Sequence, residues 1–304
     1  KIEMSSSSSS SKPIEKILNE ISSTKCFNGF VKKFSHQSVC CSCEMKLSVF
    51  LPKEATEENK VPAIFWLSGL TCNEDNFIQK AGAQRVASEL GVALICPDTS
   101  PRGCNIEGED ESWDFGTGAG FYVDATEEKW KENYNMYSYV SDELPAIVAT
   151  ELPIDSSRFS IFGHSMGGHG ALVIGLRNYR LFKTISAFAP VSQPTECAWG
   201  QKAFKNYLGE KDKSKWLEYD AVALLQHYEG DYVDVLIDQG TDDKFLKDGQ
   251  LRTEELRQVA SKANNASIVV RMQHGYDHSY HFIATFIEDH IRYHAERLGI
   301  EIKE

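Results

Sequence analysis

The chain has 304 residues, 41% of them hydrophobic, which is enough for one large α/β domain with a sizeable core. Its 44 acidic and 32 basic side chains give a net charge of −12, and no basic stripe could neutralise phosphates, which argues against nucleic-acid or anionic-membrane partners. No apolar run approaches the roughly 18 residues that a membrane-spanning helix needs.

The N-terminal segment differs in composition from the rest of the chain. Residues 5–11 are seven serines, a composition typical of disorder, and no apolar signal core is present. We therefore expect a disordered tail over residues 1–21, a single domain over residues 22–304 and a cytoplasmic protein.

The first half of the domain predicts strands, one helical stretch and a long loop. Residues 26–51 alternate like two antiparallel strands of an edge hairpin, and the apolar runs 63–67 and 92–96 are typical of buried parallel strands. Helical spacing over residues 73–90, between those runs, implies that the two strands pair in parallel. The loop over residues 98–126 is long enough to indicate a functional role.

Two glycine and cysteine patterns in this half do not predict a cofactor or metal site. The G-x-G-x-G run at residues 116–120 follows no apolar strand and precedes no Lys-Ser/Thr pair, so we expect no nucleotide there. Cys40 and Cys43 form the one C-x-x-C, without a second pair or a histidine at zinc-site spacing. Since no secretory signal is visible, the eight cysteines are expected to be reduced thiols.

A turn at residues 68–72, Ser-Gly-Leu-Thr-Cys, directly follows the buried strand at residues 63–67. Hydrolases of α/β architecture place one oxyanion-binding backbone N–H in such a turn, which nominates Leu70. The alternative is an ordinary strand-to-helix loop in which Gly69 makes the turn.

Residues 163–168 read Gly-His-Ser-Met-Gly-Gly, between a predicted strand at 158–162 and a predicted buried helix at 170–177. A bare G-x-S-x-G arises by chance in roughly one chain in ten of this length, so the flanking elements carry the interpretation. A strand that turns sharply into a helix strains the residue at the turn, and the flanking glycines let the backbones pass. Ser165 is therefore the candidate nucleophile, and the Met166 N–H at the helix N-terminus is a candidate oxyanion donor.

Strands and helices continue to alternate on both sides of this turn, as in a sheet covered by helices. The predicted strands are residues 184–188, 232–238 and 267–272, and the predicted helices are residues 136–150 with a break near Pro145, 201–226, 250–263 and 279–298.

The candidate acid and base lie on loops after the last two predicted strands. Four acids lie near the end of the strand at residues 232–238: Asp238 is still within it, Asp242 and Asp243 are in the turn, and Asp248 lies further on. We favour Asp243 over Asp242 as the acid. His278 lies in the loop after residues 267–272 and is the candidate base. The other histidines considered are assigned to strand, packing or solvent-facing positions: His164, His169, His274, His281, His290 and His294.

Ser165, Asp243 and His278 occur in this order along the chain, each on a loop after a predicted strand. A serine hydroxyl needs a base to become a nucleophile, and the imidazole needs a carboxylate to fix its tautomer. This order is that of the α/β hydrolases. The sequence therefore predicts the α/β-hydrolase fold, a mostly parallel central sheet with helices on both faces.

Several long segments, over roughly residues 22–297, resemble the S-formylglutathione hydrolase (esterase D) family. These segments are residues 66–72 (WLSGLTC), 97–103 (PDTSPRG), 118–122 (GAGFY), 163–170 (GHSMGGHG), 186–190 (SAFAP) and 276–280 (YDHSY). The resemblance implies a triad of Ser165, Asp243 and His278 and oxyanion donors at Leu70 and Met166, in agreement with the interpretation above.

The resemblance also implies that Cys72 and Trp199 line the substrate pocket. It implies hydrolysis of a small-molecule substrate, S-formylglutathione, to glutathione and formate, the last step of glutathione-dependent formaldehyde oxidation, with no metal or other cofactor. A general carboxylesterase for small acyl esters is the alternative activity. A hydrolase fold that only binds ligands is a third interpretation, against which the intact triad argues. The sequence leaves open whether the chain forms a homodimer.

Overall fold

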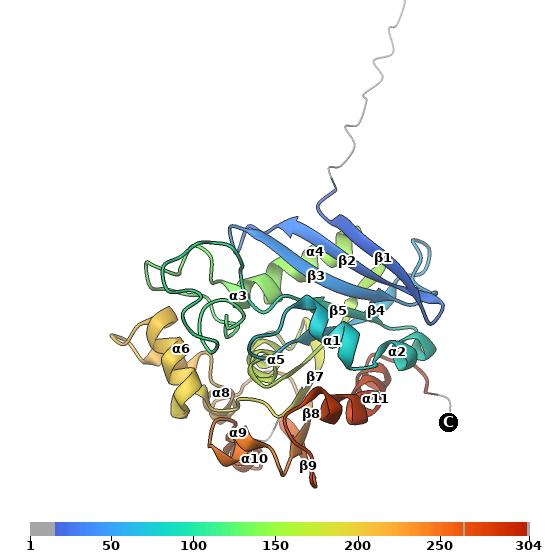
Figure 1. Cartoon of the computed structure of the whole chain (residues 1–304). Helices are drawn as coiled ribbons and strands as arrows, with labels where there is room; N and C mark the ends of the chain where they lie inside the picture. The colour runs from blue at the N-terminus through green and yellow to red at the C-terminus, as the bar shows by residue number, and fades with distance from the viewer. Residues whose placement is uncertain (1–15, 264, 303–304) are drawn as a thin grey trace, which may run out of the picture.

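The computed structural model describes residues 16–263 and 265–302, and its centre is a nine-stranded sheet (Figure 1). The strand order is β1-β2-β3-β5-β4-β6-β7-β8-β9, with antiparallel pairing from β1 to β5 and parallel pairing from β5 to β9. The strands are β1 (Asn19–Cys26), β2 (Gly29–Gln37), β3 (Glu44–Leu51), β4 (Val61–Leu67), β5 (Ala93–Pro97), β6 (Ile154–His164), β7 (Phe182–Phe188), β8 (Val233–Gly240) and β9 (Ala266–Gln273).

Helices cover both faces of this sheet because neighbouring residues of a strand point to opposite faces. On β6, Ile161 faces Gly175 of α5, whereas the next residue, Phe162, packs against His294 of α11 at a ring-centroid distance of 5.4 Å. The helices are α1 (Glu74–Lys80), α2 (Gln84–Leu90), α3 (Met136–Ser138), η1 (Tyr139–Glu143), α4 (Leu144–Glu151), α5 (Met166–Arg177), η2 (Pro194–Glu196), α6 (Ala198–Leu208), α7 (Ser214–Leu217), α8 (Ala221–Gln226), α9 (Lys244–Lys247), α10 (Thr253–Ala260) and α11 (Tyr280–Arg297).

The predicted α/β-hydrolase fold is confirmed, and the N-terminal boundary needs a correction. The first strand, β1, begins at Asn19, so residues 19–21 belong to the sheet and not to the tail. The edge therefore has three antiparallel strands where the sequence predicted two, because the polar pattern of β1 gives no apolar face. The serine run lies outside the described residues.

Three predicted helical stretches are subdivided in the structure, and the stretch 201–226 forms α6, α7 and α8. Residues 73–90 form two helices, α1 and α2, separated at Gly82, whose φ of +69° is left-handed. In residues 136–150 the interruption is the π-helical turn η1, and Pro145 stands in the first turn of α4, where proline needs no N–H partner. Within the described ranges, no helix is both long and apolar enough to cross a lipid bilayer.

Candidate active site

Ser165 occupies a sharp turn between β6, which ends at His164, and α5, which begins at Met166. Its φ of 57° and ψ of −119° lie outside the ordinary helical and strand regions. A Cβ at Gly163 would lie 2.3 Å from the carbonyl oxygen of Gly167, and a Cβ at Gly167 would lie 1.9 Å from that of Leu67. Both glycines are therefore required for the turn, as the G-x-S-x-G pattern predicts.

Asp243 and His278 meet although 35 residues separate them. His278 Nδ1 lies 2.6 Å from Asp243 Oδ2, which also accepts from Gln239 Nε2 at 3.2 Å. Asp243 Oδ1 accepts from the backbone N–H groups of Phe245 and Leu246 at 2.8 and 3.3 Å, so the carboxylate is fully buried and held from both sides. Because Asp243 accepts the Nδ1 proton, Nε2 of His278 is left as the basic atom.

The neighbouring acid, Asp242, takes no part in this contact. Its side chain is 62% exposed and lies 3.6 Å from Lys247 Nζ. Its backbone N–H donates to the carbonyl of Tyr276 at 2.9 Å, which ties the loop after β8 to the loop that carries His278. Of the two acids that the sequence left open, the structure brings Asp243 to the candidate base.

His164 and His169, which flank Ser165, are both buried. The His164 ring lies 4.3 Å from that of His278, and burial together with the nearby His278 holds its pKa well below the usual value. Burial also lowers the pKa of His169 to about 4, and its Nε2 lies 2.9 Å from the carbonyl oxygen of Phe121. Both rings are therefore neutral packing groups at pH 7, and His164 packs directly on the candidate base.

The turn after β4 comes close to Ser165 because Gly69 has no side chain. A Cβ at Gly69 would lie 3.1 Å from the Cβ of Ser165. Thr71, two residues after Gly69, has φ +68° and donates its N–H to the carbonyl of Gly118 at 2.9 Å. The long loop that contains Gly118 therefore braces the turn that presents the Leu70 N–H.

The backbone N–H groups of Leu70 and Met166 are the two candidate oxyanion donors, and Leu70 is half-buried whereas Met166 is buried. Neither donates a hydrogen bond to an acceptor in residues 16–263 or 265–302. Met166 opens α5, where the first N–H groups have no intrahelical partner and the helix dipole favours negative charge. An oxyanion-binding site requires two such unpaired N–H donors beside the nucleophile, so Leu70 and Met166 remain the candidate donors.

A cavity of about 250 Å³ opens over Ser165 and His278 at the carboxyl ends of the parallel strands. Cys72 and Trp199, the two pocket residues that the resemblance implied, both line it. Among the lining residues that the sequence analysis did not assign to the pocket are three with large aromatic side chains, Trp113, Phe245 and Tyr280.

Aromatic contacts connect the missed residues to the predicted ones. The Trp113 and Trp199 rings meet edge-on, with their centroids 5.6 Å apart. The centroid of the Phe245 ring lies 4.7 Å from that of Trp199 and 4.8 Å from that of His278. Two signals could have found them: Phe245 and Tyr280 each stand two residues after a predicted triad member, and Trp113 lies in the loop expected to be functional.

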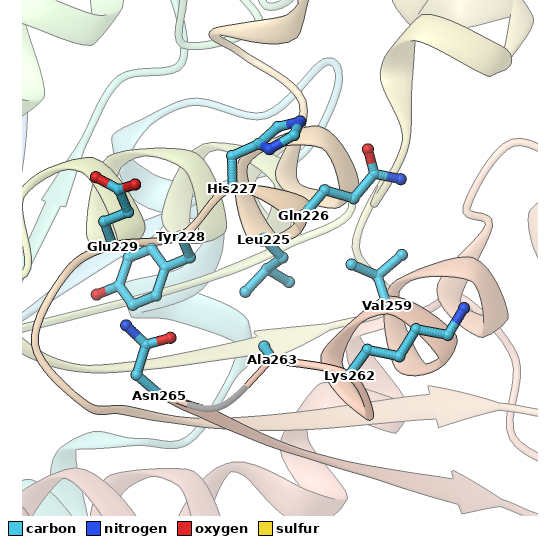
Figure 2. Close-up of a pocket in the computed structure, with 9 residues that line it drawn as sticks. All are labelled: Leu225, Gln226, His227, Tyr228, Glu229, Val259, Lys262, Ala263 and Asn265. Atoms are coloured by element: carbon cyan, nitrogen blue, oxygen red, sulfur yellow. The ribbon is translucent and has the colours of Figure 1, made fainter.

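A second cavity, of about 460 Å³, is lined by residues between Leu225 and Glu229 and between Val259 and Asn265 (Figure 2). These residues precede β8 and β9 in the chain, whereas the loops that carry Asp243 and His278 follow them. Two polar side chains on its wall are already bonded. Tyr228 Oη donates to the carbonyl of Asp231 at 3.0 Å, and Asn265 Nδ2 donates to that of Gly230 at 2.7 Å. None of the candidate catalytic residues lines this cavity.

The cysteines are separate thiols, and no metal-binding cluster is formed in the described part of the chain. All eight cysteines are free, and burial raises the pKa of Cys40 and Cys104 to about 12. Among the described residues, no three side chains of His, Cys, Asp or Glu gather as a set that could hold a metal ion.

Comparisons with known proteins agree with the fold. The model of a family described as "Putative esterase" matches residues 38–293. The S-formylglutathione hydrolase of Mus musculus is 57% identical over 282 residues, which cover 93% of this chain and 99% of that protein. That of Arabidopsis thaliana is 53% identical over 284 residues, with the same two coverages.

A solved structure leads to the same conclusion. An S-formylglutathione hydrolase from Agrobacterium tumefaciens superposes with a TM-score of 0.89 at 46% identity, covering 92% of this chain and all of that one. The similarity extends over nearly the whole length of each of these proteins, so it includes every element that carries the site. The chain belongs to the S-formylglutathione hydrolase family.

Proposed function

We propose that this chain is a serine thioesterase that hydrolyses S-formylglutathione to glutathione and formate. The observation that carries this proposal is the hydrogen-bonded pair of Asp243 and His278, at 2.6 Å, in the wall of the cavity that also holds the strained Ser165. The assignment of S-formylglutathione as the substrate rests on the relatives named S-formylglutathione hydrolase, at 53% and 57% identity.

In the acylation step, Ser165 Oγ attacks the thioester carbonyl carbon while His278 Nε2 takes the hydroxyl proton. Asp243 stabilises the resulting imidazolium. The N–H groups of Leu70 and Met166 bind the oxyanion of the tetrahedral intermediate. The carbon–sulfur bond then breaks, and glutathione leaves with the proton from His278.

In the deacylation step, His278 removes a proton from water, which attacks the formyl-serine ester. The second tetrahedral intermediate collapses to formate, and the proton returns to Ser165 Oγ. No step needs a metal or a cofactor.

A general carboxylesterase for small acyl esters is the second candidate, and the aromatic wall of the cavity favours it. Trp113, Trp199 and Phe245 provide an apolar surface that fits many small acyl or alcohol groups. A thiol with a pKa near 8.5 is a better leaving group than an alcohol, so the same residues can cleave both. The ratio of kcat/KM for S-formylglutathione to that for a small acetate ester separates the two functions, and a ratio below one would favour the esterase.

The triad assignment is tested by Ser165→Ala, Asp243→Asn and His278→Ala. We expect each to lower kcat by about 10³-fold or more with little change in unfolding temperature, because the three side chains act as a unit. Asp242→Asn is the matched control, since it removes an exposed carboxylate one residue away, and we expect it to keep at least half of the activity. A normal rate for Asp243→Asn with a large loss for Asp242→Asn would reverse the assignment of the acid.

We place the enzyme in the cytoplasm, because the eight free cysteines suit a reducing compartment. Fractionation of cells with an antibody to the chain tests this placement. Sedimentation of the pure protein tests whether it is a homodimer.

A further inference from the structure

The glutathione part of the substrate proposed above carries two carboxylates and one ammonium group. The chain itself carries a net charge of −12, so its overall field repels a net anion. Binding such a substrate therefore requires a local positive charge at the mouth of the cavity.

Two basic side chains, Lys80 and Arg102, contact residues of the cavity wall: Lys80 lies over the Tyr280 ring, and Arg102 donates to the Cys72 carbonyl. Arg102 is already engaged: its Nε lies 2.7 Å from Asp98 Oδ2, and its Nη2 donates to Asp98 Oδ1 and to the Cys72 carbonyl, both at 3.0 Å. Its charge is thus offset by a buried carboxylate.

Lys80 is different, because no carboxylate in the described ranges lies within 4.0 Å of its Nζ. It is the last residue of α1, it is exposed, and its Nζ lies 5.5 Å from the centre of the Tyr280 ring. A lysine that rests over an aromatic ring keeps its charge in water and its hydrogen-bond donors free.

Tyr280 connects this lysine to the cavity. The residue lines the cavity wall together with Cys72, and its buried hydroxyl lies beside the side chains of Ser68 and Cys72. Because the Lys80 ammonium group rests over the ring of a residue that lines the cavity, this side of the cavity has a cation without a carboxylate partner next to it.

We propose that Lys80, held over Tyr280, binds a carboxylate of the glutathione part of the substrate, an inference that rests on the proposed function. The ammonium group supplies a charge-assisted hydrogen bond on a flexible stem, which suits an extended tripeptide. The apolar side of the cavity, at Trp113 and Trp199, is then left for the remainder of the ligand.

A purely structural role for Lys80 is the competing explanation. A lysine in the last turn of a helix interacts favourably with the helix dipole, and in that role Lys80 would affect stability and not substrate binding. The two roles are separated by comparing a charged with a neutral substrate in the same variants.

The test measures KM and kcat for S-formylglutathione and for 4-nitrophenyl acetate in the wild type, Lys80→Met, Lys80→Glu and Lys80→Arg. We expect Lys80→Met to raise KM for S-formylglutathione about fivefold, Lys80→Glu to raise it further, and Lys80→Arg to stay within about twofold of the wild type. KM for the neutral ester and kcat for both substrates should not change. Lys183→Met is the matched control, because Lys183 is an exposed lysine at the amino end of β7, and its Nζ donates to the Arg180 carbonyl and pairs with no carboxylate in the described chain.

Inhibition by S-methylglutathione of the hydrolysis of the neutral ester gives a readout that needs no thioester turnover. We expect competitive inhibition with an inhibition constant about fivefold higher in Lys80→Met, and a smaller difference as added salt screens the charge. An unchanged inhibition constant in Lys80→Met, or an equal rise in KM for both substrates, would overturn the carboxylate site. A wild type that is inhibited in this way but does not hydrolyse S-formylglutathione would refute the proposed function and not the binding site.

Discussion

The turn at Ser165 depends on two neighbouring glycines, Gly163 and Gly167, because there is no room for a side chain at either position. Its backbone stays in a rare conformation because the neighbouring backbones pass within contact distance on both sides. Strain of this kind persists only where the surrounding structure determines it, as at active sites. Gly163 and Gly167 allow this conformation, and neither can be replaced even by alanine, because a Cβ at either position would clash with neighbouring backbone atoms.

Gly167→Ala should therefore abolish the fold of the turn. The added methyl group would meet the Leu67 carbonyl oxygen at 1.9 Å, so β4 and α5 must separate. We expect a loss of about 3 kcal/mol or more in the free energy of unfolding, measured in urea, together with loss of activity. Gly82→Ala is the matched control: its Cβ would meet nothing within 4 Å, so only the positive φ costs energy, about 1 kcal/mol. Equal losses in the two variants would contradict this account of the turn.

Cys72 is the thiol of the cavity wall, and we expect thiol reagents to inactivate the enzyme through it. Burial raises the pKa of this thiol, with a smaller opposing effect of Tyr280, Lys80 and Arg102. Because the thiolate is the reactive form, inactivation by iodoacetamide should be slow at pH 7 and should accelerate as the pH rises toward 9 and above. Cys72→Ser should remain active and become resistant. Equal inactivation of the wild type and this variant would assign the sensitivity to another cysteine.

At the scale of elements, a buried polar network joins α11 to the strands beneath it. His294 bonds Ser186 at 2.8 Å, Ser186 bonds His290 Nδ1 at 2.7 Å, and His290 Nε2 donates to Asp238 at 3.1 Å. Arg271 of β9 binds the same carboxylate through Nε at 2.7 Å. The network fixes β8 and β9 just before the loops that carry Asp243 and His278.

Asp238→Asn should weaken this connection. Burial alone would raise the pKa of Asp238, but hydrogen bonds from His290 and Arg271 outweigh it and lower the pKa from 3.8 to about 2. A carboxyl with a lowered pKa in the folded state stabilises it at pH values above about 4, and this contribution is lost as the pH falls toward 2. We expect Asp238→Asn to lose about 2 kcal/mol at pH 7.

The measurement is urea unfolding of the wild type and Asp238→Asn at pH 7 and pH 3. The gap between their unfolding free energies should narrow at the lower pH. His164, His169 and His294, which are buried and neutral in the folded state and do not contact Asp238, take up protons on unfolding and destabilise both proteins alike in acid, so their effect cancels in the comparison. A gap that is the same at both pH values would show that the Asp238 charge contributes nothing.

The network also shows where prediction from sequence stopped. The sharp turn at Ser165 was predictable because its glycines, its serine and the flanking strand and helix are adjacent in the chain. His290 and His294, by contrast, have the helical spacing of ordinary packing residues, and their partners lie 52 to 110 residues away. In the same way, Trp113 meets Trp199 through the path of a long loop, which no local pattern encodes. Two kinds of long-range contact could therefore be found only in the structure: contacts between distant loops, and hydrogen bonds between buried polar side chains.

For the whole molecule, the sheet edge at β1 sets the true N-terminal boundary of the domain. Most of its residues are exposed and polar, so the composition on which the expected tail over residues 1–21 depended gives no sign of a strand there. Yet β1 pairs with β2 along its length, and Leu18, just before it, is 1% exposed. A boundary drawn from polarity alone therefore cuts into the fold.

Two truncated chains, one lacking residues 1–15 and one lacking residues 1–21, test this boundary. The longer deletion removes the buried Leu18 and the pairing of Asn19 and Glu20 with β2, so we expect it to be less stable than the shorter one by about 2 kcal/mol or more in urea unfolding. Leu18→Ala in the full chain is the matched control and should account for most of that difference. Both truncated chains should keep the kcat of the full chain, because the edge at β1 contributes no residue to the cavity over Ser165. Identical unfolding midpoints for the two truncated chains would show that residues 16–21 do not stabilise the domain, and the domain would then begin at residue 22.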